Sequence, residues 1–275
     1  MTYPSPAHRW ILTIILFSSG IFAAFSESWT SRGIVEPYRD AKVSATVSGT
    51  VVSLRAEEGQ FVHAGDVVVE LDSALEALEV ERRKLVSEST AEVDAAAQRM
   101  ETLRVDYEGT KKLQEETHSV SLDDLRKKEL EYRLAEGEYQ RLSVSEERER
   151  LEWRLAEAQL QKKLITAPFD GVIVSRLLEL GEGCSPQQAL FRIADTRKCR
   201  LVAHMEQGPC QRMKPGEKVM LRINEASGPI TVAGTVEFVS PLVDASSGLR
   251  EVKVLFDNTD GRIHPGVTGA VSAER

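Results

Sequence analysis

Cysteine is scarce in this chain of 275 residues, and its three cysteines form no CxxC pair. A zinc ribbon or a thioredoxin-like redox site needs closely spaced pairs, so neither is supported. We interpret Cys184, Cys199 and Cys210 as small, semi-buried apolar side chains. The alternative is a disulfide between Cys199 and Cys210, which leaves Cys184 as a free thiol.

Histidine is also sparse, and no HxH or HExxH motif is present. Catalytic metal sites are commonly built from such paired ligands, so a metal-dependent hydrolase is not favoured. The pair His204-Met205 resembles a copper ligand set, but a single histidine in a strand is far more often structural. We therefore expect no enzyme activity, no cofactor and no metal site. The five histidines are His8, His63, His118, His204 and His264.

A basic surface is missing as well, because the formal net charge is −8 and no Lys/Arg-rich run lies outside the helical segment described below. Phosphate binding needs clustered positive charge, so nucleic acid is not expected as a partner. Aromatic residues make up only 6% of the chain, whereas 41% hydrophobic and 28% charged residues are ordinary globular values. This composition predicts a folded protein in which much of the mass is exposed helix.

One long hydrophobic run occurs, the uncharged segment Trp10–Phe25. Its 16 residues are short for a membrane span, which needs about 20, and they suit the apolar region of a signal peptide. Ala24-Phe25-Ser26 supplies small residues for a cleavage site. The alternative is an uncleaved anchor with Arg9 on the cytoplasmic side. Residues 1–29 are therefore predicted to be a signal peptide or an anchor, and the rest of the chain to lie in the periplasm.

Proline is absent from Ser73 to Lys163, a charged segment with helical periodicity. Apolar positions at heptad spacing predict a coiled-coil seam. The apolar residues at the start of the segment follow a shifted register, as a four-residue stutter would give. A polar interruption at Thr117–Ser121 divides the segment, so residues 73–164 are predicted to form an antiparallel helical hairpin with arms of roughly 65 Å. The seven-residue spacing joins Leu125, Tyr132, Tyr139, Glu146, Trp153 and Leu160.

Two similar segments flank this hairpin, Ala45–Asp72 and Ala167–Ala194, at an offset of 122 residues. The repeat predicts one β domain whose halves, residues 30–72 and 165–195, are separated by the helices. We expect tight turns at its glycines, since glycine takes positive φ at no steric cost. These glycines are Gly49, Gly59, Gly65, Gly171 and Gly181.

The remaining residues, 196–275, read as strands at regular spacing with a short helix over Glu206–Met213. Regular short strands separated by Pro-Gly and Ser-Gly turns are typical of a small β-barrel. The whole chain is thus predicted to be mixed α and β, multidomain and elongated. It comprises a split lipoyl-like barrel-sandwich hybrid, a long antiparallel coiled-coil hairpin and a small β-barrel.

Three phrases, in this order, resemble periplasmic adaptor proteins, also called membrane fusion proteins: VSGTVVSLRAEEGQFVHAGDVVVELD, ITAPFDGVIVSRLLELGEG and VEFVSPLVDASSGLREVKVLFDNTDGRIHPG. The resemblance covers nearly all of the chain from Arg32 to Val271. It implies a non-enzymatic adaptor that links an inner-membrane transporter to an outer-membrane channel. It also implies a ring of several copies. The transporter can be proton-driven or ATP-driven.

The hairpin tip is the candidate partner-binding site, on the basis of position alone. In many adaptors the hairpin tip carries an Arg, a Leu four residues later and a Ser seven residues after the Leu, and these residues engage the channel. Counting back from Ser119 or from Ser121 gives neither the Leu nor the Arg, so this chain does not match the signature. The small and apolar residues of the tip are nevertheless suited to packing against helices of a channel. The candidates are His118, Ser119, Val120, Ser121 and Leu122.

The sequence bears on three other functions. A lipoyl carrier needs a lysine at the turn between its halves, but Leu71–Leu75 contains none and the hairpin occupies that turn. A structural envelope coiled coil would explain the hairpin but neither the β repeat nor the barrel. An adaptor of an ABC-type or type I secretion exporter stays open, and nothing in the sequence identifies the exported substrate.

Overall fold

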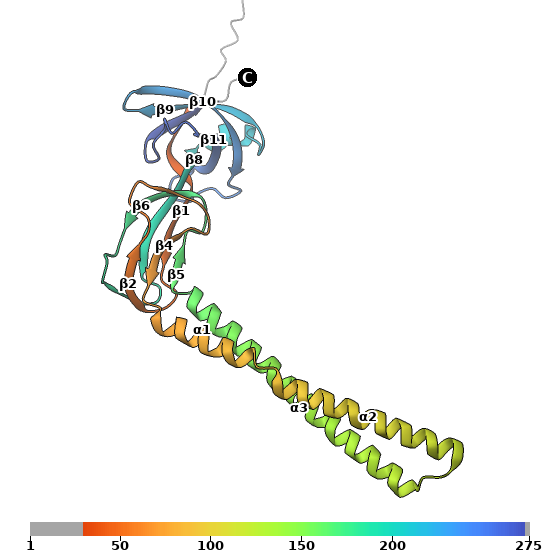
Figure 1. The fold of residues 1–275 in the computed structure, drawn as a ribbon. Coiled ribbons are helices and arrows are strands. Elements are labelled where there is room, and N and C mark those ends of the chain that lie inside the picture. Colours follow the sequence, from red (N-terminus) through yellow and green to blue (C-terminus); the bar gives the residue numbers. More distant parts are fainter. Residues whose placement is uncertain (1–29, 273–275) are drawn as a thin grey trace, which may run out of the picture.

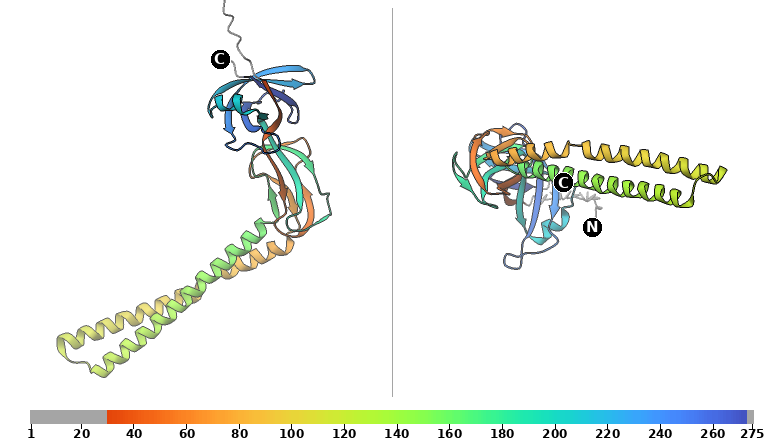
Figure 2. Two further views of the ribbon diagram at one scale, coloured as in Figure 1. Left: turned by 180° about the vertical axis from the view of Figure 1, so that it is seen from behind. Right: turned by 60° about the horizontal axis from the view of Figure 1, so that its bottom comes forward.

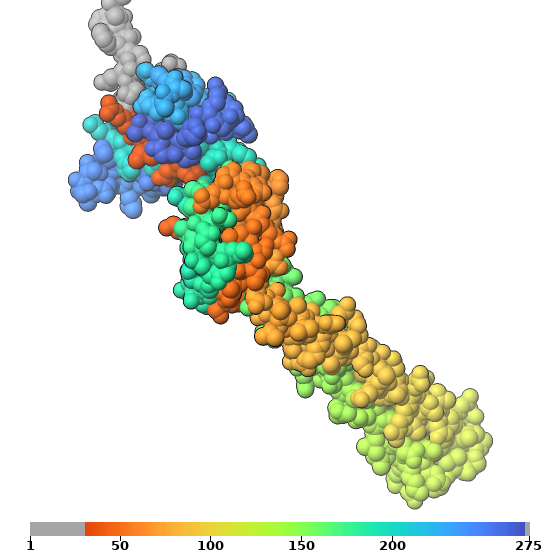
Figure 3. Space-filling model, turned by 60° about the vertical axis from the view of Figure 1, so that its left-hand side comes forward, coloured from red at the N-terminus to blue at the C-terminus, as the bar shows by residue number. Residues whose placement is uncertain are grey.

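A computed structural model describes residues 30–272, which form three bodies in a row (Figure 1). A small β-barrel lies at one end, a barrel-sandwich domain in the middle and a helical hairpin at the other end. The space-filling view shows the same extended shape (Figure 3). The segment predicted as signal peptide or anchor, residues 1–29, lies outside the described residues. Within residues 30–272, no helix is both long and apolar enough to cross a membrane.

The middle body is the split domain that the repeat predicts. Its core holds fully buried side chains from both halves, including Leu71 and Ile173. After Arg176 the chain leaves the sheet and turns. The strands of this body are β2 (Gly49–Leu54), β3 (Phe61–Val62), β4 (Val67–Leu71), β5 (Leu164–Thr166), β6 (Gly171–Arg176), β7 (Gly183–Cys184) and parts of β1 (Thr30–Ser44) and β8 (Ala189–Met205).

The two halves exchange equivalent hydrogen bonds, which gives the domain a pseudo-twofold symmetry. The Gly59 N–H donates to the Ile173 carbonyl at 2.8 Å, and the Gly181 N–H donates to the Val51 carbonyl at the same distance. These residues are related by the offset of 122 found in the sequence. Each half therefore satisfies backbone groups of the other, and neither can complete its sheet alone.

The hairpin consists of three helices, α1 (Ala74–Ser87), α2 (Ala91–Thr117) and α3 (Leu122–Gln161). The 40 residues of α3 make a rod of about 60 Å. The prediction of two continuous arms is wrong for the first arm, which breaks at residues 88–90 (Figure 2). The sequence there, Glu-Ser-Thr after Ser87, is rich in side-chain hydroxyl groups, which form hydrogen bonds to nearby backbone groups in competition with the helical hydrogen bonds. The Ser87 hydroxyl does so, since it donates to the Lys84 carbonyl at 2.9 Å.

The predicted seam of α3 is confirmed. All six residues of the seven-residue series are half-buried, and Ala135 and Ala156, each three residues after a member of the series, are buried against the first arm. Tyr132 stacks on Tyr107 of α2 with ring centroids 6.0 Å apart. The helices are therefore held together by a continuous, narrow apolar contact.

The C-terminal body is a closed barrel in which β1, β12, β9, β10, β11 and β8 follow one another and β8 pairs back to β1. The predicted short helix is confirmed as α4 (Gln207–Arg212). The stretch from Ala189 to Met205 is a single strand, β8, of 17 residues. Both β8 and β1 run through both β domains. The other barrel strands are β9 (Lys218–Glu225), β10 (Gly228–Val239), β11 (Arg250–Asp257) and β12 (Thr268–Ser272).

Candidate functional site at the hairpin tip

The tip of the hairpin is a short, internally bonded turn. His118 ends α2 in the left-handed conformation, with φ of 55°, and its N–H donates to the Gln114 carbonyl at 3.2 Å. The hydroxyl of Thr117 lies 2.7 Å from that of Ser119 and donates to the Leu113 carbonyl at 2.7 Å. These bonds hold the turn in one conformation, so the tip presents a defined surface.

Ser121 has a structural task at the tip, because it caps α3. Its hydroxyl accepts from the Asp123 N–H at 3.2 Å, and its carbonyl accepts from the Leu125 N–H at 3.1 Å. Replacing a helix cap by alanine costs about 1 kcal/mol. A change at Ser121 therefore perturbs the helix as well as the surface, which sequence reasoning had not anticipated.

The apolar part of the tip is smaller than the candidate residues imply. Val120 is half-buried, whereas Leu122 is 60% exposed and Leu113, which was not among the candidates, is 50% exposed. His118 and Ser119 are exposed polar residues beside them. The tip can therefore offer two leucines and a polar rim to a partner.

The root of the hairpin is tied to the barrel-sandwich domain. The Lys163 ammonium lies 2.9 Å from the Glu76 carboxylate and donates to the Ser48 carbonyl at 3.3 Å. The Lys163 hydrogen bond lowers the pKa of Glu76. At the start of α1 the Asp72 carboxylate accepts from the Ala74 N–H at 3.2 Å, whereas the Ser73 side chain makes no capping hydrogen bond. These contacts fix the direction in which the tip points.

The five glycines of the repeat serve two purposes. Gly59, Gly65 and Gly181 have φ of 83°, 90° and 85°, as predicted for tight turns. Gly49 and Gly171 do not have positive φ, so that expectation is wrong for them. They permit close approach instead: a Cβ on Gly171 would lie 2.7 Å from the Ala194 carbonyl oxygen, and one on Gly49 would lie 3.2 Å from Leu71.

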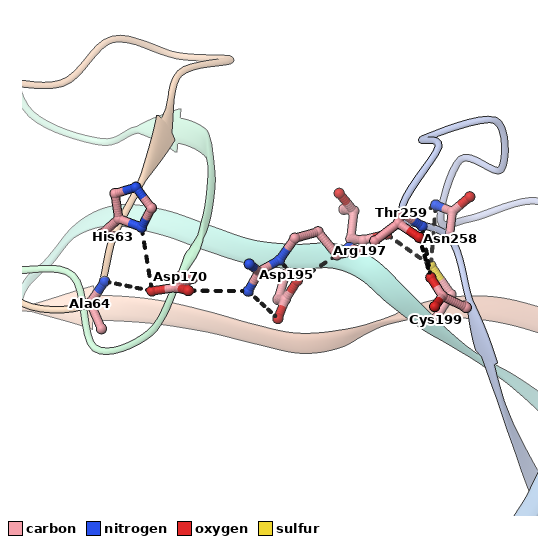
Figure 4. Close-up of polar contacts among 10 residues, drawn as sticks. His63, Ala64, Asp170, Asp195, Arg197, Cys199, Asn258 and Thr259 are labelled. Atoms are coloured by element: carbon pink, nitrogen blue, oxygen red, sulfur yellow. Dashed lines mark hydrogen bonds and ion pairs between the residues drawn. The ribbon is translucent and has the colours of Figure 1, made fainter.

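A polar chain links the two β domains, and sequence analysis missed it (Figure 4). Where β8 leaves the barrel-sandwich domain, its pairing with β1 shifts register around Thr196–Lys198. Arg197 in this bulge lies 3.2 Å from Asp195 and 3.4 Å from Asp170, which accepts from the Ala64 N–H at 2.9 Å. The hydrogen bond from the Ala64 N–H is the largest cause of the lowered pKa of Asp170, and the positive charge of Arg197 lowers this pKa further.

Asn258 completes this chain on the barrel side. Its side chain is buried, with every polar atom paired: the amide donates to the carbonyls of Thr196 and Ile263 at 2.9 and 2.8 Å, and the oxygen accepts from the Ile263 N–H at 3.0 Å. Its backbone N–H donates to the Arg197 carbonyl at 2.8 Å. The bulge is therefore held from both domains.

The cysteines lie apart as free, buried thiols, so the alternative disulfide between Cys199 and Cys210 is wrong. Burial raises the pKa of Cys199 to about 11, which disfavours the reactive thiolate. Residues 30–272 contain no group of three or more His, Cys, Asp or Glu side chains that could hold a metal ion.

Comparison with known proteins agrees with this architecture. Residues 39–195 match the family model of the CzcB-like barrel-sandwich hybrid domain, and residues 201–275 match that of the CusB-like β-barrel domain. The chain belongs to the membrane fusion protein family. The family resemblance drawn from the three sequence phrases is thereby confirmed, as are the barrel-sandwich hybrid and the barrel.

Individual relatives of this membrane fusion protein are distant. The cobalt-zinc-cadmium resistance protein CzcB of Cupriavidus metallidurans is 26% identical over 229 residues, which cover 83% of this chain and 41% of that protein. The nodulation protein NolF of Rhizobium meliloti is 26% identical over 242 residues, 86% of this chain and 60% of NolF. The chain thus spans about half the length of the curated relatives it matches.

Solved structures confirm the fold. MacA from Actinobacillus actinomycetemcomitans superposes with a TM-score of 0.71 at 22% identity, over 89% of this chain and 78% of MacA. The membrane fusion protein Spr0693 from Streptococcus pneumoniae superposes with a TM-score of 0.58 at 12% identity. At these identities the likeness shows the arrangement of domains.

Proposed function

We propose that this membrane fusion protein is a non-enzymatic periplasmic adaptor that couples an inner-membrane transporter to an outer-membrane channel. The observation that carries the proposal is the geometry of the hairpin. A rod of about 60 Å, fixed at its root by Lys163, holds a small leucine-bearing tip far from the β domains. Such a device suits reach and docking, and each tip contact gains strength when several copies act together in a ring.

The names of relatives favour divalent metal cations as the exported substrate. Two of the relatives are named for resistance to cobalt and cadmium together with zinc or nickel, and a third is named for cation efflux. In the proposed function this chain would organise the exit path, while the transporter would select the cation. Export of a different substrate through the same type of assembly is the alternative, because NolF is named for nodulation.

The test is a pair of leucine substitutions in cells that depend on the export system. Leu122→Asp puts a charge on the tip in the first turn of α3, where an acid is favourable for the helix, so folding should be unchanged. Leu75→Asp makes the same change in the first turn of α1 at the root, where the side chain is 80% exposed. We expect Leu122→Asp to lower zinc, cobalt or cadmium efflux at least tenfold and Leu75→Asp to leave it unchanged.

A photo-crosslinking residue at position 122 supplies the physical counterpart, with one at exposed Glu57 as the control. An adduct with an outer-membrane channel from position 122 alone would support the proposed tip contact. Equal adducts from both positions, or normal efflux by Leu122→Asp, would remove the tip from the proposed function.

A further inference from the structure

A recess of about 980 Å³ lies where the barrel meets the barrel-sandwich domain. One wall is β1, which lines it with the consecutive residues 34–40, so the strand presents its edge as well as its faces. Among the described residues, positions 36–44 of β1 pair with β8 alone. Small ligands commonly bind in recesses of this size between domains, and this one therefore invites a closer reading of its side chains.

The walls of the recess carry apolar side chains from both domains. Ile34, on the barrel side, is 54% exposed, and Val174 of β6, on the barrel-sandwich side, is 45% exposed. Tyr38 and Phe169 add two half-buried aromatic rings. Neither core uses the two aliphatic side chains. A ligand with an apolar body would remove this surface from water, which favours its binding.

Three arginines line the recess, and two of them are matched by carboxylates. Arg192 pairs with Asp40, and Arg200 pairs with Glu237 at 2.5 Å. The hydrogen bond to Glu237 raises the pKa of Arg200, and the negative charge of nearby Glu36 raises it further. The acidic side chains of the recess and its rim are therefore engaged with these two arginines.

The third arginine, Arg39, has no carboxylate partner. Its Cζ lies 5.4 Å from the ring centre of Tyr38 and 5.7 Å from that of Phe169, and within residues 30–272 it forms no ion pair or side-chain hydrogen bond. Aromatic faces attract a guanidinium and hold it in place, so less entropy is lost when it binds an anion. Its planar array of N–H donors matches a carboxylate or a sulfonate.

An extended peptide added to the open edge of β1 fits the recess less well. Pro37 has no N–H to donate to a new strand, and the pairing of β1 with β8 shifts register between Pro37 and Arg39. Prolines and bulges are the means by which edge strands avoid pairing with other chains. The recess therefore suits a compact ligand and not an added strand.

We propose that this recess binds an amphiphilic organic anion, with the acidic group on Arg39 and the apolar body against Val174 and Ile34. The recess lies at the opposite end of the barrel-sandwich domain from the hairpin (Figure 1), so the proposal goes beyond the adaptor function and does not depend on it. Because the ligand would contact both β domains, its binding favours the angle between them that this structure has.

Calorimetric titration of the full chain with 2-naphthoate, an aromatic carboxylate, tests this site. We expect saturable binding with a Kd of about 1 mM or lower, as is usual for so small a ligand. The matched control ligand is 2-naphthamide, which has the same ring system and no charge. It should bind at least about tenfold more weakly, because it cannot form charge-assisted hydrogen bonds as an acceptor anion.

Two pairs of variants locate the binding. Arg39→Gln should weaken naphthoate binding at least about tenfold, whereas Arg222→Gln, at an exposed arginine of β9 outside the recess, should leave it unchanged. Val174→Asp puts a negative charge on the apolar wall and should abolish binding. Its control is Val52→Asp, at the equivalent position of the other half-repeat, where the valine is 50% exposed. Val174 belongs to neither core, so its variant should fold even if the loss of Arg39 disturbs the junction.

Several outcomes would overturn the proposal. Absence of saturable binding up to about 10 mM naphthoate would do so, as would equal affinities for naphthoate and naphthamide. Unchanged binding by Arg39→Gln, or equal losses from Val174→Asp and Val52→Asp, would show that the anion binds elsewhere. The crosslink from position 122 needs the channel and not this recess, so failure of the ligand site and failure of the adaptor function give different results.

Discussion

At the scale of single residues, the internal repeat explains conformations that look anomalous in isolation. Gln187 has φ of 68°, which is costly for a residue with a Cβ. It occupies the place that Gly65, with φ of 90°, holds in the first half. The N–H of each donates to an equivalent alanine carbonyl at 2.8 Å, so the second half keeps the turn although its glycine is missing.

We therefore predict that Gln187→Gly stabilises the protein. Glycine removes the left-handed strain, which is worth about 1 kcal/mol after allowance for the greater freedom of the unfolded chain. Urea unfolding measures the change in the free energy of unfolding. At the equivalent position of the first half, Gly65→Ala should lower the free energy of unfolding by a similar amount. If Gln187→Gly instead destabilised the protein, the Gln187 side chain would have a contact that outweighs the strain.

A second prediction concerns the cysteines. All three are buried, which hinders access of a reagent, and the pKa of Cys199 is raised to about 11, which makes its thiolate scarce at neutral pH. No thiol of the folded protein should react with Ellman's reagent within minutes at pH 8, and three should react in 6 M guanidinium. A fast-reacting thiol in the folded state would contradict the burial.

At the scale of elements, the decisive feature is that β1 and β8 are shared by two domains. The bulge at Thr196–Lys198 breaks their pairing at the boundary, and Arg197 and Asn258 hold the freed backbone from either side. The junction is therefore a bonded structure and not a linker. This sets the direction of the barrel relative to the hairpin.

Asn258→Ala is expected to cost about 2–3 kcal/mol, because it removes the side-chain partner of both backbone groups of buried Ile263 and one hydrogen bond to the Thr196 carbonyl. Asn224→Ala is the matched control. Its amide makes a single exposed bond of 3.3 Å to Thr268, so the loss should stay below about 0.5 kcal/mol. Denaturant midpoints compare the two, and equal losses would show that the junction is not held by Asn258.

At the scale of the whole molecule, the hairpin is an insertion into a β domain that is complete without it. Glu70 of β4 pairs with Leu164 of β5, so the two ends of the inserted segment lie side by side. The core of the domain draws on residues from β2 to β8 and on none from the helices.

Replacing residues 73–162 by a short Gly-Ser turn should therefore give a folded, cooperatively unfolding protein. Closing a shorter loop costs less entropy, while the apolar contacts of the β domains are retained. Circular dichroism should lose its helical signal and keep a single thermal transition. An unfolded product would mean that the helices help to hold the two halves together.

The sequence alone specifies the local and periodic features. Glycine turns, the heptad seam from Leu125 to Leu160 and the repeat at an offset of 122 depend on neighbours in the chain or on a regular period. The split β domain, the hairpin and the barrel could therefore be predicted, as could the position of the tip.

The tertiary structure decided what depends on residues distant in the chain. The continuity of β8 through two domains, the paired burial of Asn258 and the close approach at Gly171 arise from partners that no local pattern identifies. The capping role of Ser121 and the half-burial of Val120 needed the geometry of the turn. Period and propensity act along the chain, whereas pairing, burial and the faces left exposed exist only once the chain has folded.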